Sequence, residues 1–372
     1  MRAGARPRQP PATSAAPRRR RTCSGRSPSR SRTMPPRSRP DPVARRGAAA
    51  TFAALCLLLP AAGGAQAGAV TAPTWESPAR YEPLNPMMVA RTGLFVPART
   101  TPTPDWRLAA IVEYGSVVER NLAFPDHYLL DAELLRVQLR ARRGLGRSAT
   151  LELEGGVVGA TAGFGDAFFE RYHELIQWVM EERDARPRNE FGDRLYLVRA
   201  QVNRTGEPRL VLPADLRATV SLAHDGGAQS VFSLTVPTTP SASRFSRGVA
   251  TASVVEQLHA RFGRRVTLTA SGGLGWTPRT GELSALQRTF VGMASGGAVV
   301  RIADAHAAYA TLLYHTAPYR ETRFPELDMA ELSVDFGYRW RTAGGRQWRF
   351  GLTEDTRRRD PGIDLILKVS VE

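Results

Sequence analysis

Polar and apolar residues alternate along many stretches of this chain, and that alternation limits the folds it can adopt. In residues 135–142, LRVQLRAR, every odd position is apolar and every even position is polar. The same period of two recurs over residues 196–203, 215–222, 265–271, 331–340, 348–352 and 363–371. Because successive side chains of a β-strand point to opposite faces, each stretch predicts a strand with one dry face and one polar face.

Strand length and the links between strands favour a membrane barrel. The strands are about ten residues long, which is the length that crosses an outer membrane. Short glycine turns, such as 225–227 and 344–345, contrast with the longer polar links 237–247 and 318–325. We therefore predict an antiparallel transmembrane β-barrel of 12–14 strands over residues 105–372, preceded by an extended segment, 68–104. An exported soluble β-sandwich that binds a ligand or partner is the alternative.

Aromatic residues near strand ends are expected to form the interfacial girdle of such a barrel. We predict that six of them point outward: Trp276, Tyr309, Tyr319, Tyr338, Trp340 and Trp348.

The N-terminal region predicts export. Residues 1–67 carry 14 arginines and one aspartate, a net charge of +13, which leaves only +3 of the total +16 for the rest. Residues 1–46 should be disordered, and residues 1–33 are not translated if Met34 is the true start. Residues 47–67 hold a short apolar run and end in Ala65-Gln66-Ala67, as a secretory signal peptide does. The near-neutral remainder argues against a nucleic-acid partner.

Export of a strand-rich chain predicts the outer membrane, with a periplasmic or secreted location as the alternative. The expected partners are outer-membrane lipid and the export and barrel-assembly machinery. Both cysteines, Cys23 and Cys56, lie in the leader, so the mature chain holds no disulfide and no cysteine-ligated metal.

One segment breaks the strand pattern. Residues 166–182 place Phe168, Tyr172, Leu175 and Val179 three or four positions apart, which predicts an amphipathic helix in a long loop. Asp166 is expected to cap its first turn.

Catalytic and metal motifs are not evident. His173-Glu174 begins like a helical zinc-protease motif, but Gln177 replaces the second histidine. No catalytic, cofactor-binding or metal-ligating residue is therefore predicted. A barrel enzyme acting on lipid is an alternative function, and it would need to bring together Ser295 and His306, or His315 and polar groups near it.

Charged residues on the polar faces are the main candidates for function. If these faces line a barrel, their charges point into an enclosed space, where unpaired charges are costly. They either fill a narrow lumen as a salt-bridge network or form a charged constriction. The predicted lumen charges are Glu133, Arg136, Arg140, Glu152, Glu154, Arg199 and Arg217. We predict a non-enzymatic outer-membrane barrel, either structural or a narrow channel.

Short motifs spread over residues 84–371 resemble the domain of unknown function 3187 family of bacterial envelope proteins. The resemblance rests on ordered anchors such as 130–133, 213–217 and 352–355. Its named positions are Asn85, Pro86, Asp131, Glu133, Asp166, His173, Glu354 and Asp355. The resemblance implies an envelope β-barrel and assigns no reaction.

Overall fold

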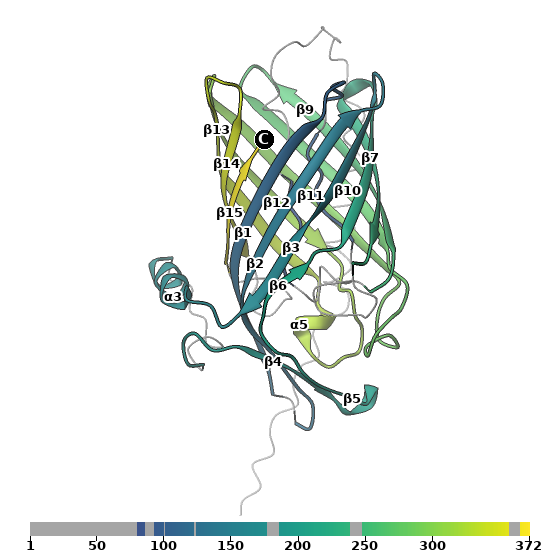
Figure 1. Cartoon of the computed structure of the whole chain (residues 1–372), viewed down its shortest axis with the longest axis vertical. Helices are drawn as coiled ribbons and strands as arrows, with labels where there is room; N and C mark the ends of the chain where they lie inside the picture. The colour runs from purple at the N-terminus through teal and green to yellow at the C-terminus, as the bar shows by residue number, and fades with distance from the viewer. Residues whose placement is uncertain are drawn as a thin grey trace, which may run out of the picture. The chain divides into compact units, whose positions relative to one another are not determined.

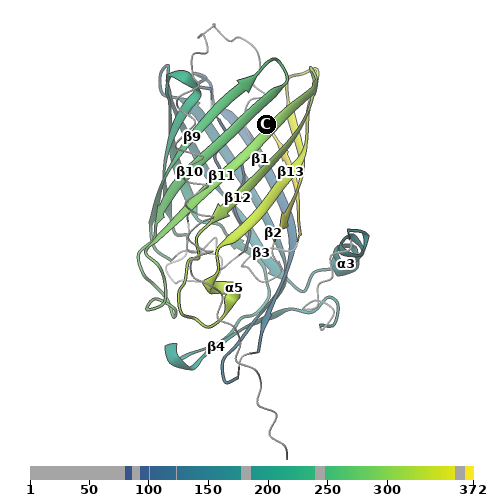
Figure 2. The same ribbon diagram turned by 180° about the vertical axis from the view of Figure 1, so that it is seen from behind.

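Twelve antiparallel strands pair edge to edge until the last one meets the first (Figures 1 and 2). In order around the ring they are β1 (Arg107–Asn121), β2 (His127–Gly144), β3 (Ala149–Thr161), β7 (Leu216–Ala223), β8 (Ala228–Val236), β9 (Thr251–Phe262), β10 (Val266–Trp276), β11 (Phe290–Ala303), β12 (His306–His315), β13 (Glu331–Arg341), β14 (Gln347–Asp355) and β15 (Leu365–Val371). The predicted closed barrel of 12–14 strands is confirmed. A two-layer sandwich is excluded, because one continuous sheet closes on itself.

The computed structural model describes residues 80–85, 93–99, 101–122, 124–176, 186–238, 248–356 and 365–372. All of them belong to one compact unit, residues 48–372. The predicted leader and signal peptide lie outside the described residues, as do Pro86 and the end of the predicted helix.

The alternation read from the sequence places apolar side chains on the outside of the barrel. On β2, Leu135 and Leu139 are 38% and 63% exposed, while Arg136 is buried on the inner face. The same outward apolar surface continues around the ring, at Val112, Leu153, Phe232, Leu234, Leu268, Leu274, Phe290, Val300, Leu312, Phe350 and Val369. An apolar outside and a polar inside are the arrangement that a lipid bilayer requires of a barrel.

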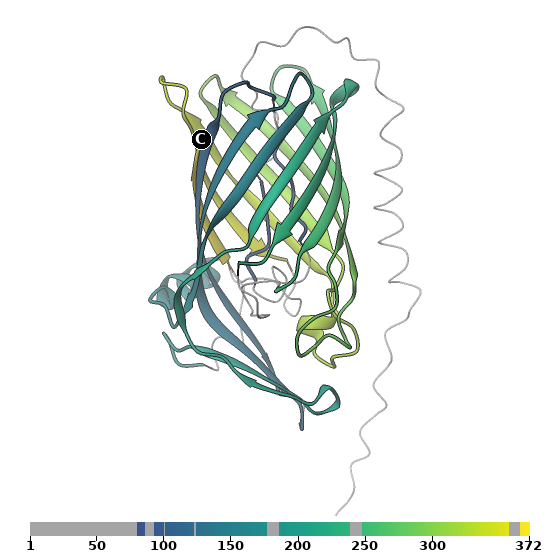
Figure 3. The ribbon, with the colours of Figure 1, turned by 45° about the vertical axis from the view of Figure 1, so that its right-hand side comes forward.

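The two ends of the barrel differ in the length of their connections (Figure 3). One end has the tight turns 145–148, 225–227 and 263–265. At the other end, residues 162–215 make a long excursion that holds α3 (Asp166–Leu175), β4 (Gly192–Leu197), η2 (Val198–Ala200), β5 (Val202–Thr205) and β6 (Arg209–Pro213). A second long link at this end carries α5 (Pro325–Asp328). We call these the turn end and the loop end.

The continuous strand predicted over residues 196–203 is wrong. The chain leaves strand geometry after Leu197, and Gln201 adopts a left-handed conformation with a φ of 54°. Strands β4 and β5 instead form a hairpin, and β4 pairs with residues 127–131 at the loop end of β2. The alternating letters at 196–203 therefore span a turn, which period two alone does not reveal.

Helix α3 confirms a helical segment in a long loop, but two details differ from the prediction. Gly165 precedes its first turn, and Asp166 instead accepts a hydrogen bond from the Asn189 amide at 2.6 Å. Phe168 and Leu175 are exposed, while Phe169 is buried and stacks on Tyr114 of β1 at 6.1 Å. The helix therefore packs through the face that the sequence pattern left polar. No helix within the described ranges is long and apolar enough to cross a membrane.

The predicted outward girdle is correct for some aromatics and wrong for two. Trp276, Tyr338 and Trp340 are exposed. Tyr309 and Tyr319 are buried instead. Tyr309 points into the barrel, where its hydroxyl accepts a hydrogen bond from Arg349 Nε at 3.0 Å. Tyr319 lies in a loop that folds over the loop end, and there it joins an apolar cluster.

Candidate functional site

Five of the predicted lumen charges lie together on the inner wall. Arg136 and Arg140 come from β2, Glu152 and Glu154 from β3, and Arg217 from β7. Strand register sets their proximity, because Glu154 is paired with Arg140 on one side and with Arg217 on the other. Arg217 Nη1 lies 3.3 Å from Glu154, and Arg140 Nη1 lies 3.8 Å from Glu152.

Two predicted lumen charges lie elsewhere. Glu133 is three residues from Arg136, so period two places it on the opposite, outer face of β2. There its carboxylate accepts hydrogen bonds from the amides of Phe164 and Gly165 at 2.9 and 2.6 Å. Arg199 lies in η2 at the loop end, where it is paired with Glu321 at 2.9 Å. Both predictions of a lumen position are corrected.

The lumen also holds a segment that the sequence did not point to. Residues 80–85 and 93–98, which we call the plug, run inside the barrel (Figure 3). Tyr81 and Val96 bridge the two parts through backbone hydrogen bonds of 3.1 and 2.7 Å. The described plug residues from Arg80 to Asn85 are all buried, as are Leu94, Phe95 and Val96.

The plug completes the charge network of the wall. Arg80 lies 2.6 Å from Glu152 and 2.7 Å from Glu154. The Glu82 carboxylate accepts a forked pair of hydrogen bonds from Arg217, one of them at 2.9 Å. Arg136 donates to the plug backbone, to Glu82 O at 2.9 Å and Pro83 O at 3.1 Å. Each plug charge therefore neutralises wall charges of the opposite sign, which is the condition for burying them.

A second contact joins the plug to the last three strands. Lys368 of β15 lies 3.2 Å from Asp335 and 3.7 Å from Glu113. Its ammonium also sits 4.0 Å from the centroid of the Tyr81 ring, a cation–π arrangement. The Tyr81 hydroxyl is 2.8 Å from Ser333 Oγ, and Arg349 Nη1 donates to Arg80 O at 3.0 Å.

The other part of the plug packs on apolar wall residues. Leu94, Phe95 and Val96 form a buried cluster with residues of β8, β9, β11 and β12, namely Val231, Val255, Val291, Met293 and Leu313. The guanidinium carbons of Arg80 and Arg217 lie 4.1 and 4.8 Å from the centroid of the Phe95 ring. Gln257 donates to Pro97 O at 2.8 Å. The plug therefore spans the lumen from a charged wall to an apolar wall.

Burial and charge pairing shift the pKa values of the plug residues. Burial alone disfavours the Glu82 anion, yet the arginines, led by Arg217, hold the pKa of Glu82 below its usual value. Burial lowers the pKa of Arg80, although Glu154 and Glu152 oppose this shift. Burial and the nearby Glu331 raise the pKa of Tyr81 well above 10. The plug thus binds with Glu82 ionised and Tyr81 neutral.

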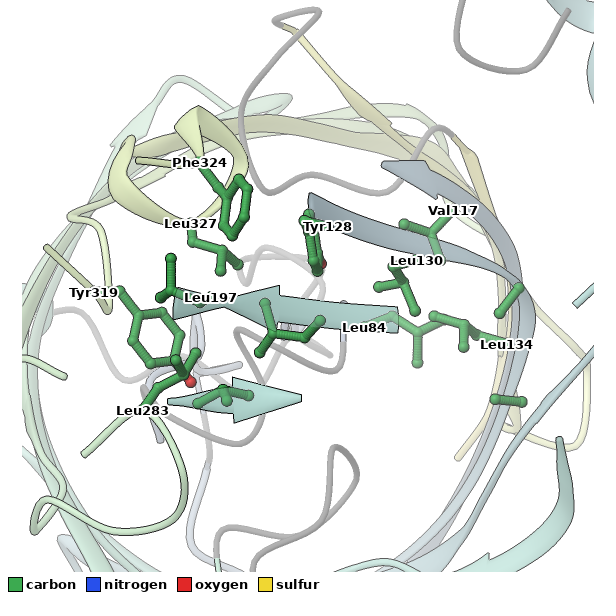
Figure 4. Packing of buried hydrophobic residues seen from close by; sticks show 14 of the residues in the cluster. Leu84, Val117, Tyr128, Leu130, Leu134, Leu197, Leu283, Tyr319, Phe324 and Leu327 are labelled. Atoms are coloured by element: carbon green, nitrogen blue, oxygen red, sulfur yellow. The ribbon is translucent and has the colours of Figure 1, made fainter. Parts of the chain in front are cut away.

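An apolar cluster covers the loop end of the lumen (Figure 4). Its side chains come from the plug, the wall, the β4–β5 hairpin and the long links, and include Leu84, Tyr128, Leu130, Leu197, Leu283, Tyr319, Phe324 and Leu327. The space bordered by Tyr81, Asn85 and Ser333 is too small to hold a water molecule. Packed side chains therefore fill the lumen at both levels.

The positions named by the family resemblance fall into two groups. Asn85 belongs to the plug and donates to Glu119 of β1 at 2.7 Å. The others described surround α3 at the loop end. Asp131 pairs with Arg186 at 2.6 Å, and His173 Nε2 lies 3.3 Å from Glu354. Asp355 ends β14, opposite Ser333 of β13. Most of these side chains hold the long excursion to the barrel.

In one of the two residue sets of the enzyme alternative, His315 is buried on the inner wall, where its Nε2 lies 3.1 Å from Glu331. The residues of the other set, Ser295 and His306, are far apart. Ser295 pairs with Leu313 of β12, and His306 lies seven residues along that strand, or about 23 Å. The two residues also point to opposite faces, so they cannot form a dyad. Within the described ranges, no group of three or more His, Cys, Asp or Glu residues is arranged to hold a metal ion.

Comparison with known proteins gives only distant likenesses. No family model matches the sequence, and no curated protein matches it. An outer-membrane channel from Pseudomonas putida F1 has a TM-score of 0.45 and 14% identity, with 74% of this chain and 97% of that chain covered. The NanC porin has a TM-score of 0.40 and 9% identity, covering 72% and 98%. The Pseudomonas putida toluene transporter TodX has 0.36 and 8%, covering 73% and 88%. Likeness at this level assigns no function.

Proposed function

We propose that this chain is a non-enzymatic outer-membrane β-barrel that forms a narrow channel, and that the plug closes this channel. The apolar outer surface fits a lipid environment, and the polar inner wall fits a water-filled path. One observation carries the proposal. The segment that fills the lumen at the level of the charge network is not part of the wall, and it is held there by side-chain contacts.

The unequal ends give the proposed orientation. Outer-membrane barrels place short turns in the periplasm and longer loops outside the cell. The turn end, which also holds the C-terminus, would then face the periplasm. In this orientation α3 and the apolar cluster lie at the outer surface. The predicted signal peptide, the lipid partner and the export and assembly machinery belong to the same proposal.

The alternative is a purely structural barrel, in which the plug never leaves the lumen. Planar-bilayer recording separates the two functions. A full-chain variant that we call the released variant combines Glu82→Gly with Phe95→Ala, and it removes the fork on Arg217 and the ring between the two walls. We expect rare openings of the natural chain and frequent, larger openings of the released variant.

The control carries Ser271→Ala and Ser295→Ala, because these lumen hydroxyls bond to each other at 2.5 Å. It should conduct like the natural chain. Heat-modifiable gel migration establishes that each variant forms a closed barrel. The released variant keeps the apolar cluster at the loop end. If it is folded but does not conduct, the plug is not what closes the lumen, and the structural role is favoured.

Membership of the domain of unknown function 3187 family remains a prediction. Aligning members of that family to residues 84–371 tests it. The named positions, such as Asn85 and His173, should then fall in matching columns.

A further inference from the structure

The two plug side chains that meet at Arg217 have the chemistry of a single ligand. Glu82 presents a carboxylate to the edge of the guanidinium, through the forked hydrogen bonds. Phe95 presents an aromatic ring to its face, 4.8 Å from the ring centroid. Planar guanidinium groups bind carboxylates with their edge and stack aromatic rings on their face. Glu82 and Phe95 therefore make the two kinds of contact that the Arg217 guanidinium favours.

Departure of the plug would leave the donors of this site without their acceptors. Arg217 Nη2 would lose the Glu82 carboxylate, and Arg136 would lose the carbonyl oxygens of Glu82 and Pro83. Arg136 Nε would keep Glu113 at 2.5 Å, and Arg217 would keep Glu154 and Thr235. Both cations therefore stay in place. Arg217 keeps a donor aimed at the former position of the Glu82 carboxylate, and the Arg136 guanidinium lies 4.0 Å from that position.

The opposite wall supplies an apolar surface at the same level. Val231, Val255, Val291 and Leu313 contact the apolar part of the plug and belong to the barrel wall. Departure of the plug would uncover them at the level of Arg217. Departure of Arg80 would also leave Glu152 paired with Arg140 at 3.8 Å and Glu154 paired with Arg217 at 3.3 Å. A ligand in this space would thus meet Arg217 and Arg136 beside these paired carboxylates on one side, and aliphatic side chains on the other.

We propose, on the basis of the proposed channel function, that the open lumen binds a small aromatic carboxylate at Arg217 and Arg136. Its carboxylate takes the place of Glu82, and its ring takes the place of Phe95 between Arg217 and the apolar wall. The plug is then an internal mimic of the solute, and solute and plug compete for one site.

The probe is 3-phenylpropionate, which carries both groups on a short flexible link. Calorimetry with the released variant in detergent measures binding whether or not the barrel conducts. We expect 3-phenylpropionate to bind at least tenfold more tightly than propionate, which lacks the ring, or 3-phenylpropionamide, which lacks the charge. In the natural chain, where Glu82 and Phe95 occupy the site, binding should be at least tenfold weaker.

Two further substitutions in the released variant locate the site. Arg217→Gln should weaken 3-phenylpropionate binding at least tenfold. Arg339→Gln is the matched control, because Arg339 is also a buried lumen arginine but packs on Tyr309, 5.2 Å from its ring centroid. It should leave binding unchanged. The same ligand should reduce the conductance of the released variant.

The outcomes separate this inference from the channel itself. A folded released variant that binds the ligand but does not conduct overturns only the channel. A conducting variant that binds the amide as tightly as the carboxylate overturns the inference, since micelle partition or apolar contact then explains binding. Equal losses in Arg217→Gln and Arg339→Gln overturn it too, because a general loss of positive charge would then suffice.

Discussion

The two halves of the barrel wall solve the problem of a polar interior differently. Strands β13–β15, β1–β3 and β7 bury charged residues, namely Asp335, Arg339, Arg349, Lys368, Glu113, Arg136, Glu152, Glu154 and Arg217. On β8–β12 the buried polar residues that the structure describes are Ser, Thr, Gln and His. The plug has the same division, since Arg80 and Glu82 face the charged half and Leu94 and Val96 face the other.

This difference indicates which half of the wall contributes most of the free energy of plug binding. A buried charge that loses its partner is strongly destabilised, whereas a neutral hydrogen bond contributes little net free energy. The charged half should therefore decide whether the plug stays in the lumen. The uncharged half should set how closely it packs.

The largest effect is expected from Glu82→Leu. It leaves Arg217 buried without its forked partner, and the free energy of plug binding should fall by about 3–5 kcal/mol. The measurement is the denaturant concentration at which half of the plug is released. Protease cleavage of the plug in detergent reports this release. The double variant Glu82→Leu with Arg217→Met removes both charges and should recover much of the loss. If Glu82→Leu alone is neutral, the charged half does not hold the plug.

A smaller effect is expected from Gln257→Leu on β9. This change removes one hydrogen bond to the plug, from Nε2 to Pro97 O, and one within the wall, between Oε1 and His259 Nε2. Only the first should weaken plug binding, by about 1–2 kcal/mol in the same assay. A loss as large as that of Glu82→Leu would end the distinction between the two halves.

Almost no effect is expected when Ser271 and Ser295 are both changed to alanine. The two hydroxyls bond to each other, so removing both leaves no stranded donor or acceptor. The free energy of barrel unfolding, obtained from the denaturant midpoint, should change by less than about 0.5 kcal/mol, as for most surface substitutions. Either single variant should be less stable than the double variant, because it leaves one buried hydroxyl without its partner.

Between pH 5 and pH 9 the plug should be insensitive to pH. Because docking lowers the pKa of Glu82, its contribution is complete above the free glutamate pKa of about 4.3 and is lost as the pH falls towards the lower docked value. Because docking raises the pKa of Tyr81, its contribution is complete below about pH 10 and is lost as the pH rises further. Channel opening measured against pH should stay flat between these limits. A transition inside this range would assign control to another titratable group that contacts the plug.

The sequence predicts the barrel where the two strand faces differ strongly. Residues 135–142 alternate leucine or valine with arginine, and the structure places them as predicted. Residues 306–315 have alanine, tyrosine and leucine on both faces, so nothing in the sequence says which way Tyr309 points. The prediction groups Glu133 with Arg136 because both are charged, although a spacing of three residues already places them on opposite faces of a strand.

The plug could not be derived from local pattern. Residues 80–85 mix charged, aromatic and apolar types, and their burial depends on partners more than 50 residues away, such as Arg136 and Arg217. One signal did exist. A wall rich in inward arginines and glutamates predicts that something must neutralise them, and Arg80 and Glu82 are charges in the segment just before the barrel.

Lys368 has a practical consequence, because it is the sole lysine of the 372-residue sequence. Its side chain is only 2% exposed, under the ring of Tyr81. Apart from the amino terminus, the chain thus carries one primary amine, and the plug shields it from solvent. Acylation of this amine by a water-soluble ester should proceed only as fast as the plug leaves. Under the proposed function, the acylation rate of Lys368 would therefore measure how often the plug leaves the lumen, with no residue to introduce by mutation.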